Sequence, residues 1–230
     1  MIDWHSHILP GIDDGSRDVA ESLSMLEMLS DQGIQTVVAT PHFYANDGSV
    51  RDFLERRREA WEQLQSQLPA NAPQILLGAE VRYYQGISRM ENLPQLCIEG
   101  TKLLLLEMPM AGWPEYAIQE LAELSGKSGM QLVMAHIDRY WDLQKRSQWE
   151  RLYESGIRMQ VNADYFTGFF SRGKALSLLQ AGGIHFIGSD CHNTTTRAPQ
   201  FHKAFGYIRK KLGDEFVDQM NGYGYAVLGR

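Results

Sequence analysis

Short apolar segments alternate along the whole chain with amphipathic helical segments, and this alternation constrains the fold more than any other feature of the sequence. Strands that are apolar on both faces and alternate with helices are typical of a parallel sheet covered by helices. The expected strands are 1–6, 34–40, 74–80, 102–107, 131–136, 157–162 and 184–189. The expected helices are 18–33, 50–68, 115–128, 145–155, 172–182, 198–212 and 213–220.

The number of strand–helix units predicts the architecture. Seven units without a linker-like break in composition are expected to form one domain over residues 1–230. The favoured fold is an α/β barrel that is closed or nearly closed, and an open doubly wound sheet is the alternative. Neither Gly-x-Gly-x-x-Gly nor the phosphate-loop pattern G-x-x-x-x-G-K-[S/T], which would support the open sheet, occurs in the chain.

Residues that can bind metal ions stand at the carboxyl end of almost every predicted strand. In a β/α barrel the side chains at these ends converge on one site. A single histidine or glutamate at a strand end is more often a hydrogen-bonded core residue, but the joint pattern favours a metal site. These residues are His5, His7, His42, Glu80, Glu107, His136, Asp190 and His192, with Asp13 and Asp14 in the first loop.

The chemistry of this set narrows the choice of metal. Imidazoles and carboxylates without a required thiolate suit Mn, Fe or Zn better than Ca, and exclude an iron–sulfur cluster. Without cations, several clustered carboxylates would repel one another and take up protons. Two or three divalent ions would offset that charge. His185 and His202 lie outside the pattern and are expected to be structural or exposed.

Charge and composition argue against several classes of protein. The formal net charge of −6 makes tight nucleic-acid binding unfavourable, because that binding depends on neutralising phosphates. The apolar runs are too short to span a bilayer, and the N-terminal residues lack the features of a secretory signal. Two cysteines do not form a disulfide framework. We therefore expect a cytoplasmic protein without membrane insertion or nucleic-acid partner, and the sequence leaves its oligomeric state open.

Short motifs give the sequence a family resemblance. They are HSH near the N-terminus, then IDDG, TPH at 40–42, GAE at 78–80, LLLE at 104–107, AHIDRY at 135–140 and SDCHN at 189–193. In order and spacing they resemble the polymerase-and-histidinol-phosphatase (PHP) family, and more narrowly its bacterial capsular and exopolysaccharide tyrosine-protein phosphatases. The resemblance covers most of the chain, from Met1 to about Arg197. It implies a distorted seven-stranded, TIM-like β/α barrel with a trinuclear centre.

The resemblance also implies a ligand set and a reaction. The centre is expected to hold three divalent ions, usually manganese, with iron or zinc as alternatives. The implied ligands are His5, His7, Asp14, His42, Glu80, Glu107, His136, Asp190 and His192. Arg139 and Arg197 match basic positions of the family, and guanidinium groups bind phosphate through two parallel hydrogen bonds. Aromatic residues beside the strand ends offer stacking surfaces for a phosphotyrosine ring. They are Phe43, Tyr44, Tyr83, Tyr84, Trp113, Tyr140, Trp141, Tyr165 and Phe166.

The implied activity is metal-dependent hydrolysis of phosphotyrosine, with the autophosphorylated tail of a tyrosine kinase for polysaccharide export as substrate. Histidinol phosphate or another small phosphomonoester is the alternative substrate. A phosphodiesterase is disfavoured by the acidic charge, and a metal-binding regulatory module by the complete ligand set. An amidohydrolase should have a lysine and a histidine where this chain has Glu107 and Asn162.

A cysteine-based mechanism is the main rival. Cys191 and Arg197 fit C-x5-R, the signature of cysteine-dependent tyrosine phosphatases. That mechanism needs a loop whose amides wrap the phosphate and lower the pKa of the thiol. The intervening HNTTT contains no glycine, and His192 belongs to the proposed ligands. We interpret the cysteine as incidental.

Overall fold

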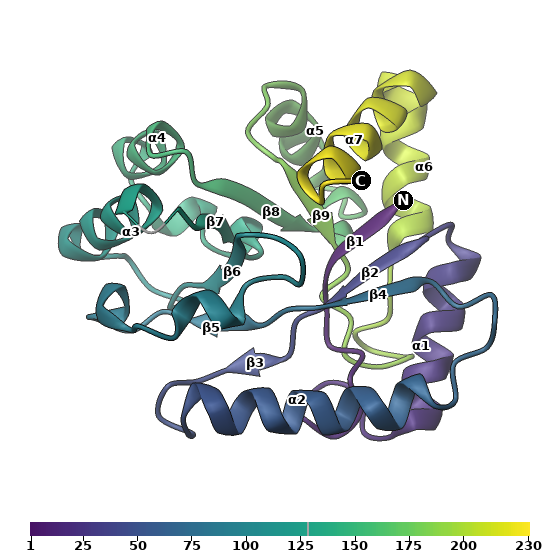
Figure 1. Cartoon of the computed structure of the whole chain (residues 1–230). Coiled ribbons are helices and arrows are strands. Elements are labelled where there is room, and N and C mark those ends of the chain that lie inside the picture. Colours follow the sequence, from purple (N-terminus) through teal and green to yellow (C-terminus); the bar gives the residue numbers. More distant parts are fainter. Residues whose placement is uncertain (128) are drawn as a thin grey trace.

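The computed structural model describes residues 1–127 and 129–230, and it has the expected alternation of strands and helices (Figure 1). The strands are β1 (Ile2–Ser6), β2 (Thr36–Ala39), β3 (His42–Phe43), β4 (Gln74–Leu77), β5 (Glu80–Arg82), β6 (Leu103–Glu107), β7 (Gln131–Met134), β8 (Arg158–Asn162) and β9 (Phe186–Gly188). The α-helices are α1 (Val19–Asp31), α2 (Val50–Gln65), α3 (Glu115–Lys127), α4 (Arg146–Glu154), α5 (Arg172–Gln180), α6 (Phe201–Leu212) and α7 (Asp214–Val227). Short 3-10 helices are η1 (Ile87–Arg89), η2 (Leu93–Leu96), η3 (Ile137–Arg139), η4 (Trp141–Leu143) and η5 (Ala163–Phe166).

Two of the predicted strands are interrupted. The segment 34–40 forms β2, and β3 begins only after Pro41, which has no amide hydrogen to donate to a neighbouring strand. The segment 74–80 forms β4, and β5 begins after Gly78 and Ala79. Backbone hydrogen bonds still connect the two paths, from Gly78 N to Ala39 O (2.8 Å) and from Glu80 N to Pro41 O (3.0 Å).

These interruptions divide the strands into two parallel sheets. One has the order β1-β2-β4 and the other the order β3-β5-β6-β7-β8-β9. The sheets curl together into a half-barrel with helices around the outside (Figure 1). The α/β class and the parallel strands agree with the sequence prediction. The expected single barrel of seven strands differs from this description, because the breaks at Pro41 and Gly78 separate two sheets.

The first strand lies beside the segment that follows the last one. Asp190 N donates to His5 O (2.7 Å), His7 N donates to Cys191 O (3.0 Å), and Ser6 pairs with Cys191 as an isolated parallel bridge. The predicted ligands His5 and Asp190, from opposite ends of the sequence, are therefore held together by a main-chain hydrogen bond.

Buried strands and capped helices explain why the chain folds locally as predicted. All residues of β1, β2 and β6 are buried, as expected for strands covered on both faces. Helix α1 begins after Asp18, whose side chain accepts the amide hydrogen of Glu21. Helix α2 begins with a capping box between Ser49 and Asp52.

The last helix is longer than the sequence indicated. We expected 213–220, but α7 continues to Val227 through two glycines that disfavour helix. Gly224 is buried against β1: a Cβ at this position would lie 3.0 Å from Ile2 Cδ1 and 3.3 Å from Trp4 Cζ2. Close packing on β1 thus extends the helix against its local propensity. Within the described residues, no helix combines the length and hydrophobicity needed to cross a membrane.

Candidate metal centre

The nine predicted ligands come together at one end of the curled sheets. His5 and His7 lie in β1 and just after it, and Asp14 lies in the following loop. His42 and Glu80 begin the short strands β3 and β5, whereas Glu107 ends β6. His136, Asp190 and His192 directly follow β7 and β9. All except Asp14 and His42 are buried.

Glu80 lies among four imidazoles. Its Oε2 is 3.2 Å from His5 Nε2, 3.3 Å from His7 Nε2 and 3.0 Å from His42 Nδ1. Its Oε1 is 2.8 Å from His136 Nε2. Burial by itself would raise the pKa of Glu80, but His5 and the hydrogen-bonding histidines hold it well below its usual range. Glu80 is therefore an anionic carboxylate surrounded by four potential ligand nitrogens.

Asp190 approaches the same histidines from β9. Its Oδ1 is 3.5 Å from His5 Nε2 and 3.4 Å from His7 Nε2. Those two imidazole nitrogens are themselves only 3.1 Å apart. Two acceptor nitrogens at this distance repel each other unless a proton or a cation lies between them. Glu80 and Asp190 thus face a common position beside the H-x-H pair.

Asp14 lies on the solvent-exposed side of the cluster, where it contacts two of the histidines. Its Oδ1 is 3.3 Å from His42 Nε2 and 3.4 Å from His192 Nε2. Three overlapping groups have ligand atoms within 4.8 Å of one another: His7, Asp14, His42 and His192; His5, His7 and Asp190; and His42, Glu80 and Glu107. Every predicted ligand except His136 belongs to one of these groups, and His136 contacts Glu80.

Buried polar atoms without hydrogen bonds provide a test of whether the residues fit a metal. Six such side-chain atoms occur in the described residues, and all but one belong to predicted ligands. Leaving a buried polar atom unpaired costs about 1–3 kcal/mol, so a cluster of them is unfavourable unless a further group binds there. The atoms are His42 Nδ1, Glu80 Oε2, Glu107 Oε2, His136 Nδ1, His192 Nε2 and the Tyr140 hydroxyl. Some of them lie within ion-pair distance of a neighbour without the geometry of a hydrogen bond, since Glu80 Oε2 is 3.0 Å from His42 Nδ1 and Glu107 Oε2 is 2.7 Å from Arg82 Nη1. This mixed nitrogen and oxygen set fits divalent transition metals.

Asp13 orients two of the histidines rather than facing the cluster. It accepts hydrogen bonds from His7 Nδ1 (2.7 Å), His42 N (2.9 Å) and Gly15 N (3.0 Å). Burial favours its neutral form, but the contact with His7 keeps its pKa well below the usual range. Because Nδ1 of His7 donates to Asp13, Nε2 faces the centre in the form that binds metal.

Gln160 orients His5 as Asp13 orients His7. The sequence analysis did not identify this residue. Its Oε1 accepts the His136 amide hydrogen (2.6 Å) and lies 3.3 Å from His5 Nδ1. An amide oxygen only accepts, so Nδ1 of His5 carries the proton and Nε2 is free for metal. The one signal in the sequence was a glutamine within the apolar strand β8, where it is fully buried.

Gly188 of β9 makes room for this arrangement. A Cβ there would lie 2.5 Å from His5 Cβ and 2.8 Å from Gln160 Nε2. No other residue fits without moving the strand or the histidine. Two ligands also have left-handed backbone conformations, with φ of 31° at His136 and 50° at Asp190. Such conformations are uncommon outside glycine and occur often at functional sites.

The predicted arginines lie on the Asp190 side of the centre. Both contact that carboxylate, Arg139 through Nη2 to Oδ2 and Arg197 through Nη2 to Oδ1 (3.0 Å). They line a cleft of about 250 Å³ together with Asn162 and Asp164. A third arginine, Arg82, was missed by the sequence analysis although it ends a strand, and its Nη1 is 2.7 Å from Glu107 Oε2.

The aromatic residues proposed to surround the site divide into two groups. Phe43, Trp113, Tyr140 and Phe166 are buried in the core. Tyr44 is 37% exposed and stacks on His42, with ring centroids 5.2 Å apart. Tyr44 thus offers a partly exposed aromatic face next to a predicted ligand, whereas the Tyr140 ring, 5.4 Å from that of His136, is buried.

The rival cysteine mechanism finds no support in the geometry. Cys191 is fully buried, and this burial raises the pKa of its thiol far above the usual range. Its main chain pairs with β1 instead of wrapping an anion. As expected, His185 and His202 are not part of the cluster: His185 accepts the Met159 amide hydrogen, and His202 is exposed on α6.

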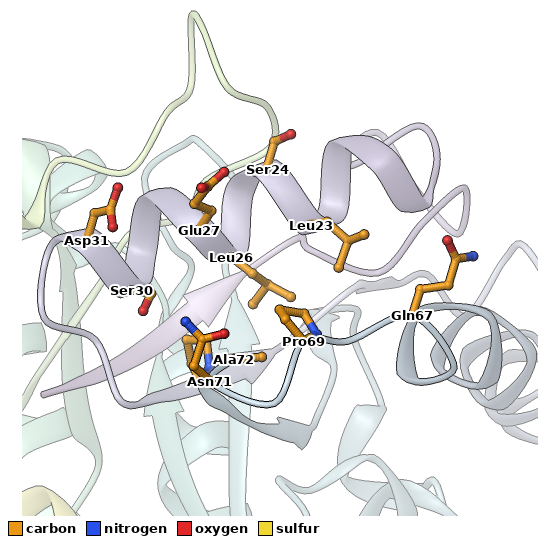
Figure 2. Close-up of a pocket in the computed structure, with 11 residues that line it drawn as sticks. Leu23, Ser24, Leu26, Glu27, Ser30, Asp31, Gln67, Pro69, Asn71 and Ala72 are labelled. Carbon is orange, nitrogen blue, oxygen red and sulfur yellow. The ribbon is translucent and has the colours of Figure 1, made fainter.

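A larger cleft than the one beside the arginines lies elsewhere. It has a volume of about 480 Å³ between α1 and the connection from α2 to β4. Figure 2 shows Leu23 and Leu26 of α1 facing Pro69 across it. None of the predicted ligands or arginines lines this cleft. The candidate centre is therefore distinguished by its chemistry and not by its volume.

Comparisons with known proteins show which family the chain belongs to. The family model described as capsular polysaccharide synthesis, CpsB/CapC, matches residues 1–223. Tyrosine-protein phosphatase YwqE of Bacillus subtilis (strain 168) is 35% identical over 94% of this chain and 86% of the relative. Tyrosine-protein phosphatase CpsB of Streptococcus agalactiae serotype III (strain NEM316) is 29% identical over 96% of this chain and 94% of the relative.

A solved structure extends the similarity to three dimensions. It comes from work on YwqE of Bacillus subtilis and CpsB of Streptococcus pneumoniae, described as unique metal-dependent tyrosine phosphatases. It superposes with a TM-score of 0.80 at 29% identity and covers 99% of this chain and 94% of its own. The resemblance inferred from the motifs is confirmed, and the chain belongs to the CpsB/CapC family of capsular polysaccharide synthesis proteins.

Proposed function

We propose that this protein is a metal-dependent protein-tyrosine phosphatase that regulates a tyrosine kinase of capsular or exopolysaccharide synthesis. The observation that carries the proposal is the contact of Glu80 with four imidazoles beside buried ligand atoms that lack hydrogen bonds. The phosphatase names of the relatives and the metal-dependent solved structure support it.

The ligand groups accommodate three divalent ions, which we propose to be manganese, with iron or zinc as alternatives. His5, His7 and Asp190 would hold one ion, and His42, Glu80 and Glu107 would hold a second. The third ion would be held by His7, Asp14, His42 and His192, so this group shares His7 with the first and His42 with the second. The chemistry that bound divalent cations supply is Lewis acidity toward water and toward phosphoryl oxygens. His136 would complete the set through its contact with Glu80.

The chain's own residues would bind and orient the phosphate. Arg139 and Arg197 lie on opposite oxygens of Asp190, at the edge of a cleft that is open to solvent. With Asp190 engaged as a metal ligand, the guanidinium groups of Arg139 and Arg197 would donate paired hydrogen bonds to phosphoryl oxygens. Tyr44, stacked on His42, would support the aromatic ring of the substrate.

We also propose a barrel architecture, a kinase substrate and a cellular compartment for this phosphatase. The interrupted strands β2/β3 and β4/β5, with the β1–Cys191 contact, support a single distorted seven-stranded PHP barrel over residues 1–230. We propose the phosphorylated tail of an autophosphorylated kinase as substrate, and the cytoplasm as the compartment where both meet. The net charge of −6 supports the absence of a nucleic-acid partner.

The test compares substrates on the metal-loaded enzyme. Protein stripped with EDTA and reloaded with Mn²⁺ is assayed on p-nitrophenyl phosphate, a phosphotyrosine peptide and histidinol phosphate. We expect at least tenfold higher kcat/KM for the peptide than for histidinol phosphate, about 1.4 kcal/mol of transition-state discrimination. Glu80→Gln should abolish turnover, whereas Glu62→Gln, in an exposed pair with Arg58, should not. Absence of turnover on all three substrates would refute the proposed phosphatase activity. Preference for histidinol phosphate would refute the proposal that the substrate is a phosphotyrosine protein.

A further inference from the structure

Two consecutive phenylalanines protrude from the loop between η5 and α5. Phe169 is 75% exposed and Phe170 is 94% exposed, the two highest values among the large hydrophobic residues of the described chain. Their rings contact edge to face, with centroids 5.2 Å apart. Exposing two adjacent aromatic rings is unfavourable in water, and such a patch marks an interaction surface.

The loop is anchored in a defined position beside α6. The Arg172 guanidinium lies over the Phe169 ring at 5.4 Å and over the Tyr207 ring of α6 at 5.3 Å. This double cation–π contact joins the phenylalanine loop to α6. The pair of rings is therefore presented by a fixed support.

The neighbouring face of α6 is cationic. Lys203, Lys210 and Lys211 lie four residues before and three and four residues after Tyr207, so they share its face of the helix. All three are exposed, and in the described part of the chain none forms an ion pair. By contrast, Arg209 pairs with Asp214 and Lys174 with Asp142. Uncompensated positive charge thus borders the phenylalanines in a chain whose net charge is −6.

We propose that this surface, formed by Phe169, Phe170, Arg172, Lys203, Lys210 and Lys211, docks on an anionic phospholipid membrane. The phenylalanines enter the interface between headgroups and acyl chains, and the four cations contact lipid phosphates. Interfacial binding of this kind combines buried apolar area with attraction to anionic lipids, and neither part alone gives stable binding. The inference is independent of the reaction that the metal centre performs.

The shape of the surface favours a membrane over a protein partner. Aromatic side chains on the tip of a loop form a protrusion and not a groove, and neither Phe169 nor Phe170 lines the cleft beside the arginines or the cleft beside α1. A protrusion between cations penetrates a soft, negatively charged layer without needing a matching cavity. A phosphotyrosine peptide is the competing occupant, since Thr167 of the same loop lines the cleft with Arg139 and Arg197.

The experiment is co-sedimentation of the full chain with large vesicles. Vesicles of phosphatidylcholine alone are compared with vesicles containing 30% phosphatidylglycerol, at about 0.05 and 0.5 M NaCl, where the Debye length falls severalfold. We expect binding to the anionic vesicles at low salt, lowered at least about tenfold by the double substitution Phe169→Ser/Phe170→Ser. Lys203→Glu/Lys210→Glu should weaken binding similarly and remove its salt dependence.

A matched variant and an activity readout separate the outcomes. Tyr116→Ser removes a 52% exposed aromatic residue from α3, on the other side of the molecule (Figure 1), and should bind as wild type. Turnover of p-nitrophenyl phosphate should be unchanged in all variants, which distinguishes a failed docking surface from a failed enzyme. Equal sedimentation of wild type and the phenylalanine variant would overturn the proposal. So would a variant that leaves vesicle binding intact and raises KM only for a phosphotyrosine peptide.

Discussion

The side-chain oxygen of Gln160 lies 3.3 Å from His5 Nδ1, and this contact fixes which nitrogen of His5 faces the metal centre. The same oxygen accepts the His136 amide hydrogen at 2.6 Å, so one buried glutamine on β8 positions ligands from β1 and from the end of β7. Groups that hold metal-binding histidines in this way determine their tautomer and direction, and their loss lowers metal affinity.

Gln160→Leu should therefore weaken the centre without removing a ligand. We expect roughly 10–100-fold weaker binding of Mn²⁺ and a loss of about 1–3 kcal/mol in unfolding free energy, because buried donors lose their acceptor. Metal titration by calorimetry and urea unfolding measure the two effects. Gln119→Leu, on the exposed face of α3, is the control and should match wild type in both. Wild-type affinity in Gln160→Leu would contradict the positioning role.

Gly188→Ala tests the close approach of β9 to His5. The added methyl group would lie 2.5 Å from His5 Cβ, so the strand or the histidine must move. Overpacking of this kind costs about 1–3 kcal/mol, and displacement of His5 should also reduce bound metal, measured by elemental analysis. Gly206→Ala in α6 meets nothing within 4 Å and should be neutral or slightly stabilising. Full metal content in Gly188→Ala would show that the contact is dispensable.

The stability of the protein should fall as the pH drops, partly because of His185. Burial lowers the pKa of this histidine, and the nearby Arg158 adds to the effect. Because the folded state resists protonation, its contribution to stability is present above the pKa of the unfolded chain and is lost below about pH 6.5. One proton changes the unfolding free energy by at most about 1.4 kcal/mol per pH unit. Urea unfolding between pH 5 and 8 should show a shallower dependence of the unfolding free energy on pH for His185→Gln than for wild type. An unchanged slope in His185→Gln would exclude this source of acid sensitivity.

Cys191→Ser should leave catalysis intact. The thiol is buried and its pKa is strongly raised, so it provides no nucleophilic thiolate near neutral pH. We expect the variant to keep turnover of p-nitrophenyl phosphate within about twofold, and EDTA to abolish it in both proteins. The reverse result, activity that survives EDTA and disappears with Cys191→Ser, would establish the C-x5-R mechanism instead.

The sequence predicts the elements and the ligand types of this fold but not the contacts between strands. Ligand residues at strand ends are visible because the periodicity of apolar segments shows where each strand stops. The extension of α7 to Val227 depends on the packing of Gly224 against β1, which local propensity does not record. Gln160 and Arg82 were missed because a lone glutamine or arginine in a strand has no spacing signature. Their roles come from neighbours on other strands, at His5 and Glu107.

Arg197→Lys separates charge from geometry in phosphate binding. Arg197 lies 3.0 Å from Asp190 Oδ1, and its side chain is 38% exposed at the cleft. Lysine keeps the positive charge but loses the planar fork that donates two parallel hydrogen bonds, so the transition state should be bound less well. We expect kcat/KM on a phosphotyrosine peptide to fall about 10–100-fold, equivalent to about 1.4–2.7 kcal/mol, at unchanged metal content. Arg58→Lys, in an exposed pair with Glu62, is the control and should retain wild-type kinetics. If Arg197→Lys loses metal in proportion to activity, the guanidinium acts by holding Asp190 and not by binding phosphate.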